Sequence, residues 1–165
     1  MSDLAKAIGF SKAYIYKFFD SKQAIGEMIC ANRLAMIMDI VNAALVDAPT
    51  ASEKLRRLYK ALIEAGSDLF FHDRKLYEIA AVSSRERWPS AVAYEEKLRQ
   101  LVQQILLEGR QSGEFERKTP LDEAADAIYL VMRPYACPIQ LQYNLDSSES
   151  AAVLLPSLIL RSLAP

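Results

Sequence analysis

Residues 3–29 read DLAKAIGFSKAYIYKFFDSKQAIGEMI. This stretch predicts two short helices, joined by a tight turn and followed by the start of a longer helix. Gly9 supplies the turn, because glycine adopts a left-handed backbone at no steric cost. Ser11 is expected to cap the second short helix, and Ile15 and Phe19 are expected to turn inward. The stretch therefore predicts a helix-turn-helix at the start of the chain.

The second short helix presents amines, phenols and one small side chain outward. These residues are Lys12, Ala13, Tyr14, Tyr16 and Lys17. Such a surface suits the major groove of double-stranded DNA. Lys22 begins the following helix, where its ammonium group and the free backbone amides both favour a phosphate. A lone lysine would more often be an ordinary solvated side chain, and Tyr16 alone a half-buried packing residue, but the contiguous pattern favours a DNA-binding helix.

The same stretch resembles the DNA-binding signature of the TetR family of transcription regulators. The matching features are Leu4-Ala5, Gly9-Phe10-Ser11, Ile15-Tyr16, Phe19 and Ser21-Lys22. The resemblance implies that Tyr16 and Lys22 contact phosphates. It places Lys12, Ala13 and Tyr14 at the positions that read bases. It also implies an all-α fold, in which a helix-turn-helix DNA-binding domain precedes a helical ligand-binding and dimerisation domain.

Members of that family have one more helix before the helix that begins near Asp3. We expect that first helix to be missing here, with Met1 an internal methionine or the edge of a shortened sequence. Without it Leu4, Ile8 and Phe19 would face water, and each large side chain contributes roughly 1.5–3 kcal/mol when it is buried. We therefore expect residues 1–20 to bind DNA weakly.

The composition is that of a folded protein with almost no net charge. Hydrophobic residues make up 52% of the 165, and 20 basic residues against 21 acidic ones give a net charge of −1. A disordered chain would have fewer apolar residues, and any nucleic-acid site must be local. Cys30 and Cys137 are too few for a disulfide framework, which favours a reducing cytoplasm. The uncharged runs are too short to span a bilayer, so no membrane partner is expected.

No catalytic or metal-binding pattern accompanies this composition. The sequence has no nucleophile–base pair, no glycine-rich phosphate loop and no cluster of metal ligands around His72, its only histidine. We therefore expect neither an enzyme nor a bound metal or cofactor.

Capping signals divide the remaining sequence into helices, with no strands. Asp20 with Gln23, and Thr50 with Glu53, resemble capping boxes. The helix after the first box is expected to bury Ile25, Met28, Ile29, Met36, Ile40 and Ala43. The helix after the second box, over 51–72, is expected to bury Leu55, Leu58, Tyr59, Leu62 and Leu69.

Proline and glycine mark the later boundaries. Pro89 suits the first turn of a helix that Gly113 stops. Thr119 is expected to cap a helix from about 120, and Asp146 with Glu149 to cap the last one. These boundaries predict two regions: a DNA-binding region over 1–46, which includes a connecting helix, and a regulatory domain over 47–165.

Aromatic residues are concentrated in the middle of the chain, where they predict either a core or the wall of an effector pocket. The predicted pocket residues are Phe70, His72, Trp88, Tyr94, Tyr129, Met132 and Arg133. Arg133 or His72 would orient a polar end of a small molecule.

The last helix carries an apolar stripe with little chain left to cover it. The stripe is Ala151, Leu154, Leu155, Leu158 and Ile159. Together with the helix from about 120, it predicts a homodimer joined by four helices. The chain as a whole is predicted to be a repressor that a small molecule releases from its DNA operator. The alternative is a helical ligand-binding or partner-binding protein that does not bind DNA.

Overall fold

The computed structural model describes residues 21–165, and every regular element in that range is a helix. The elements are α3 (Lys22–Leu45), α4 (Ala51–His72), α5 (Arg74–Arg85), α6 (Pro89–Ser112), α7 (Leu121–Ala136), α8 (Pro138–Leu141), the 3-10 helix η1 (Leu145–Ser147) and α9 (Ser148–Ser162). No strand occurs within residues 21–165, so the all-α prediction is confirmed there. Five predicted DNA contacts lie outside the described residues: Lys12, Ala13, Tyr14, Tyr16 and Lys17.

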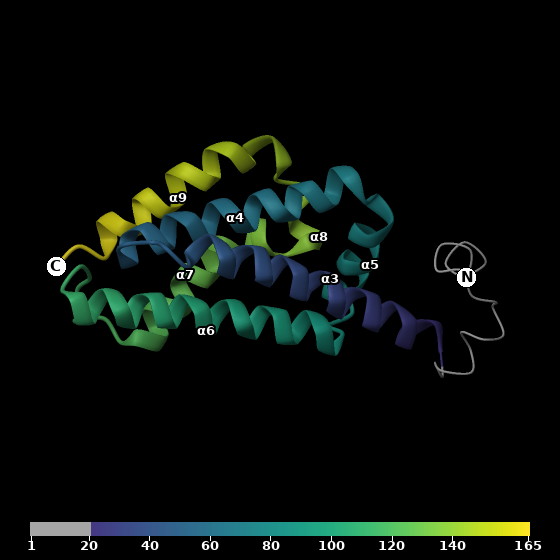
Figure 1. The fold of residues 1–165 in the computed structure, drawn as a ribbon, viewed down its shortest axis with the longest axis horizontal. Helices are drawn as coiled ribbons and strands as arrows, with labels where there is room; N and C mark the ends of the chain where they lie inside the picture. Colours follow the sequence, from purple (N-terminus) through teal and green to yellow (C-terminus); the bar gives the residue numbers. More distant parts are fainter. Residues whose placement is uncertain (1–20) are drawn as a thin grey trace.

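Helix α4 is the central helix of the bundle (Figure 1). It contacts α3, α6, α7 and α9, while α5 and α8 lie together near the start of α3. Its inner face is the predicted stripe of Leu55, Leu58, Tyr59, Leu62 and Leu69, and all five are buried. The spacing of these residues therefore predicted the buried face of α4 correctly, since a helix with one apolar side and otherwise polar sides can bury only the apolar side.

Helix α3 buries only part of the predicted face. Ile25 is buried as predicted and Ile29 is half-buried, but Met28, Met36, Ile40 and Ala43 are exposed. The other buried positions include Cys30, Leu34, Ile37 and Val41. The prediction was wrong because α3 is apolar on nearly all sides, so its sequence does not single out one face. Helix α3 is also long and apolar enough to cross a membrane, but its buried face packs against α4, α5 and α6.

Two of the predicted helix ends are confirmed. The Thr50 hydroxyl accepts a hydrogen bond from the Glu53 amide at 3.1 Å and caps α4. Gly113 follows α6 with a φ of 83°, a left-handed conformation that favours glycine at a helix end. Both the Thr50 cap and the Gly113 stop depend on residues within one helical turn, so both can be predicted from the sequence.

Three other predicted ends are displaced by one or more residues. The hydroxyl of Ser21 caps α3, whereas Asp20 lies outside the described residues. Pro120, not Thr119, immediately precedes α7, and no side chain caps that helix. Helix α9 begins at Ser148 without a side-chain cap, because η1 occupies the residues expected to begin it.

The start of α4 has a second cap, which comes from the turn after α6. The Glu114 carboxylate accepts hydrogen bonds from the amides of Ala51 and Ser52, each at 3.0 Å. Burial favours a raised pKa for Glu114, but hydrogen bonds from Ser52, Ala51 and Ser112 outweigh it and lower the pKa. The carboxylate thus joins the central helix to the far end of α6.

Replacing Glu114 with glutamine is expected to lower the free energy of unfolding by about 1 kcal/mol near neutral pH, because two helix amides lose a charged acceptor. Since the folded-state pKa is lowered, this stabilisation is present above the ordinary carboxyl pKa and is lost as the pH falls through the folded value. Urea denaturation across the acid range measures both effects.

The matched control is Glu96→Gln, since Glu96 is exposed on α6 and bonds only to Gln100. Equal stabilities of the two variants near neutral pH would contradict the capping role of Glu114.

Candidate functional site

Helix α3 begins where the predicted DNA-binding stretch ends. The Ser21 hydroxyl accepts a hydrogen bond from the Ala24 amide at 3.1 Å. Lys22 is exposed in the first turn, where the free amides of the helix add to its positive charge. This position suits a phosphate contact, and Lys22 is the one predicted DNA contact within residues 21–165.

The Glu27 carboxylate of α3 caps the start of α6. Its two oxygens accept hydrogen bonds from the Ser90 amide at 2.6 Å and the Ser90 hydroxyl at 2.8 Å. Pro89 has no amide hydrogen, and Trp88 offers no side-chain cap, so Ser90 carries the first free amide of α6. A charged acceptor at this place is strongly favoured. The beginning of α3 is therefore held against the beginning of α6.

The Trp88 ring packs directly on the backbone of α3. A β-carbon built at Gly26 would lie 3.1 Å from two atoms of that ring. Glycine at position 26 therefore permits the close approach that brings Glu27 to Ser90. The Trp88 indole also donates a hydrogen bond to Glu86 at 3.0 Å, which orients the ring.

Two further contacts hold α3 to α5. The Cys30 thiol donates to the Ser83 hydroxyl at 3.0 Å, and both residues are buried. Arg33 pairs with Asp73 at 3.4 Å, and the same Asp73 side chain caps α5 through the Leu76 amide. Three polar contacts thus follow one another along α3, so α3 is joined to the bundle from its first turns onward.

A cavity of about 430 Å³ lies beside this junction. It is formed by the start of α3, by α5 and by Trp88, and its wall is mostly apolar. Lys22 lines the same cavity, together with Lys75 and Glu78.

The predicted effector residues are not gathered around one cavity in the described part of the chain. Tyr94, Tyr129 and Met132 are buried in the core, whereas Trp88 lies at the junction with α3. Phe70 packs edge-on against Tyr77, with ring centroids 4.9 Å apart, and His72 is exposed at the end of α4.

Tyr129 and its neighbours nonetheless form a partly buried polar cluster between α6 and α7. The Arg99 guanidinium lies 4.4 Å from the centre of the Tyr129 ring. Burial and the Glu95 charge raise the pKa of Tyr129 to about 12, against the opposing charges of Arg99 and Arg133. The Nε atoms of Arg99 and Arg133 are buried without a hydrogen-bond partner in the described residues.

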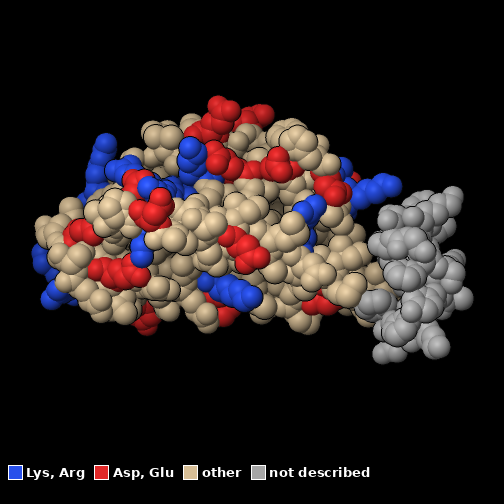
Figure 2. All heavy atoms as spheres, in the orientation of Figure 1, with Lys and Arg blue, Asp and Glu red and all other residues tan. Residues whose placement is uncertain are grey.

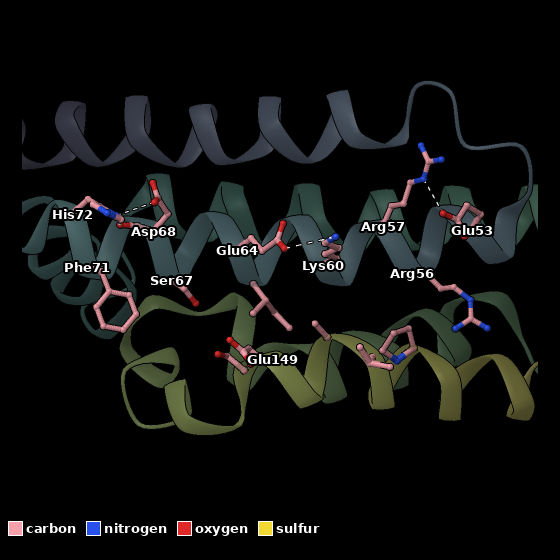
Figure 3. A pocket seen from close by; sticks show the side chains of 15 residues that line it. Glu53, Arg56, Arg57, Lys60, Glu64, Ser67, Asp68, Phe71, His72 and Glu149 are labelled. Carbon is pink, nitrogen blue, oxygen red and sulfur yellow. Dashed lines mark hydrogen bonds and ion pairs between the residues drawn. The ribbon is translucent and has the colours of Figure 1, made fainter.

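An open cavity of about 770 Å³ lies between α4 and α9. We call it the α4–α9 groove. Charged side chains line it, most of them on α4 (Figure 3), and its apolar lining includes Ile63, Ala152 and Pro156. His72 is the predicted effector residue that lines it. Figure 2 shows both acidic and basic side chains on the face of the molecule where α4 and α9 lie.

The predicted dimer stripe of α9 is divided between two sides of the helix. Ala151 and Ile159 are buried within the protomer, and Leu155 is half-buried against the same core. Leu154 and Leu158 are 64% and 63% exposed. The prediction that all five residues form one exposed surface was therefore wrong, because α9 also packs on α4.

A family model described as the C-terminal domain of tetracyclin repressor-like proteins matches residues 51–153, more than half of the chain. The chain belongs to the TetR family. It is therefore a transcriptional regulator, and the resemblance of its first residues agrees with that assignment. No curated protein matches the chain.

Solved structures of TetR family regulators share the fold. A bacterial regulatory protein of the tetR family from Rhodococcus RHA1 aligns with a TM-score of 0.64 and 15% identity, over 99% of this chain and 85% of that chain. The reduced form of NemR from E. coli aligns with a TM-score of 0.63 and 15% identity, over 100% of this chain and 86% of that chain. At this identity the likeness concerns the fold.

The residues that fasten α3 were not found from the sequence. Glu27 and Ser90 are 63 positions apart, and Cys30 and Ser83 are 53 apart. A local pattern does not reveal such pairs. The available signal was that Glu27 and Arg33 are two of only four charged residues in α3, since a partly buried charge requires a partner.

Proposed function

We propose that this TetR family regulator is a dimeric repressor that binds operator DNA through residues 1–22 and is released by a small molecule. The contact of Glu27 with Ser90 carries the proposal. It supports coupling because it ties the helix after the DNA-binding stretch to the regulatory helices. Residues 1–46 act as the DNA-binding region and 47–165 as the regulatory domain, with α3 shared between them. DNA binding places the protein in the cytoplasm.

Release by a ligand requires that the ligand bind one arrangement of α3 more tightly than the other. A tenfold change in operator affinity corresponds to about 1.4 kcal/mol of coupling. Two protomers would place their recognition helices about 34 Å apart, in successive major grooves. A tilt of α3 in each protomer changes that spacing, which is sufficient for release.

The interior cluster of Tyr94, Tyr129, Met132 and Arg133 supports effector binding through its buried arginine Nε atom. A ligand there must displace packed side chains, since Tyr94 and Met132 are fully enclosed by the core. Phe70, Trp88 and His72 lie outside this cluster.

Lys22→Ala is expected to weaken binding to the DNA upstream of the protein's own gene, because one phosphate contact per protomer is lost. The slope of log affinity against log salt should fall by about 0.9 per protomer. Fluorescence anisotropy across a salt series measures the slope.

The matched control is Lys118→Ala, in the turn between α6 and α7 at the far end of the bundle from Lys22 (Figure 1). Identical slopes for the two variants would remove Lys22 from the interface. Absence of any DNA binding by the unaltered protein would instead favour the ligand-binding or partner-binding alternative.

Exposed apolar side chains on α7 and α9 support dimerisation. Helix α7 presents Leu130 and Val131, and α9 presents Leu154 and Leu158. Leu154 and Leu158 are four residues apart and share one face of α9, whereas Leu130 and Val131 are adjacent and point in directions about 100° apart on α7. Burying a large apolar side chain contributes roughly 1.5–3 kcal/mol, so these four residues suffice for a core of an interface.

Replacing both Leu154 and Leu158 with aspartate is expected to convert a dimer to a monomer at micromolar concentration, because four carboxylates would meet across the two-fold axis. Sedimentation velocity measures the change. Leu107→Asp is the matched control, since Leu107 is exposed on α6. A monomeric unaltered protein, or a dimer that survives both aspartates, would contradict this interface.

A further inference from the structure

The α4–α9 groove has the size and lining of a small-molecule site. Its volume of about 770 Å³ lies within the range of about 300–1,000 Å³ typical of such sites. The floor is apolar, with Ile63 from α4 and Ala152, Val153 and Pro156 from α9. Phe71 lies at one end and is 68% exposed, so an aromatic face is available to a ligand.

Arg56 and Arg57, two of the basic side chains that line the groove, are already engaged by the protein. Arg57 contacts Glu53 at 2.9 Å and Asp47 at 2.5 Å. Arg56 donates to the Ser157 hydroxyl at 3.2 Å. These contacts hold both guanidinium groups at the end of the groove opposite Phe71. Figure 3 shows Arg56 and Arg57 near that end of α4.

The carboxylates at the other end are much less engaged. Glu149 has no basic side chain within 4 Å among the described residues, and Glu64 has only Lys60, at 3.9 Å. Figure 3 places Glu64 on the α4 wall and Glu149 on the α9 wall. This end of the groove therefore has negative charge on both walls, beside an exposed aromatic ring.

A hydroxyl group on the α4 wall, further toward Phe71 than Glu64, lacks a partner. The Oγ atom of Ser67 is buried and makes no hydrogen bond within the described residues. In Figure 3 this hydroxyl points toward α9. An unpaired buried polar group is costly, and a ligand that donates a hydrogen bond to it removes the cost.

The geometry points to a binding site for an organic cation with an apolar body. The ammonium group lies between Glu64 and Glu149 and donates to Ser67, and the apolar body lies on the floor of the groove. The Phe71 ring attracts the same cation through its electron-rich face. An anionic ligand is disfavoured, because both carboxylates repel it.

This site borders the helix that leads to the DNA-binding stretch. Asp68, which lines the groove, holds His72 at 2.8 Å. The same two residues line a second, smaller cavity whose other wall is α3, with Arg33, Met36 and Ile40. A cation near Asp68 competes for this contact, so the groove is an effector site of the proposed repressor in addition to the interior cluster, and that role rests on the proposed function.

The test compares three probes of matched shape: 4-phenylbutylammonium, 4-phenylbutan-1-ol and 5-phenylpentanoate. Calorimetry on the whole chain without DNA is expected to rank the ammonium first and the carboxylate last. Glu64→Gln and Glu149→Gln should each weaken ammonium binding by about two- to fivefold, as for an exposed ion pair. Neither change should alter binding of the alcohol, and added salt should narrow the difference between the probes.

Glu96→Gln is the matched control, since Glu96 is an exposed carboxylate on α6 outside the groove. Backbone amide shifts should map the ammonium to residues 63–72 and 148–156. Three results would each overturn the site. They are equal affinity for the ammonium and the alcohol, unchanged ammonium binding when Glu64→Gln and Glu149→Gln are combined, and amide shifts confined to other helices. Because this assay contains no DNA, its failure is distinct from failure of operator binding.

Discussion

The Glu27 carboxylate joins the beginnings of two helices, and the arrangement of the end of the bundle depends on this contact. Helix α6 starts with Pro89, which donates no hydrogen bond, so its first free amide needs an acceptor from elsewhere. Glu27 supplies that acceptor from α3. The approach of the two helices depends in turn on Gly26, since a side chain there would press on Trp88. The Glu27 charge, the first amide of α6 and the packing of Trp88 on Gly26 therefore all contribute to the same junction.

In the proposed repressor, this junction is the route by which a change among the helices after α3 reaches the start of α3. Helix α3 is fastened at successive turns, through Ser90, Ser83 and Asp73. Ser90 belongs to α6, Ser83 belongs to α5, and Asp73 lies between α4 and α5. Because α3 is bonded to all three, we expect a shift of those helices to move α3 with them. The α4–α9 groove touches the same system from the other side of α4, through Asp68 and His72.

Features that depend on a few neighbouring residues were predictable from the sequence, and features that depend on distant packing were not. The cap at Thr50, the stop at Gly113 and the buried face of α4 follow from local spacing. The buried face of α3 does not, because nearly every side of that helix is apolar. The stripe of α9 was divided because a terminal helix packs on its own protomer as well as on a partner. Glu27 was missed because Ser90 lies 63 positions away.

Native-state hydrogen exchange of the Glu27→Ala variant tests the central claim most directly. The account predicts that exchange quickens at the Ser90 amide and also along residues 26–33 of α3, by about tenfold for a loss of about 1.4 kcal/mol. Glu78→Ala, which removes an exposed carboxylate of α5 paired within its own helix to Arg74, should leave both segments unchanged. Faster exchange at Ser90 alone, with α3 protected as before, would contradict the claim that this contact holds α3 to the regulatory helices.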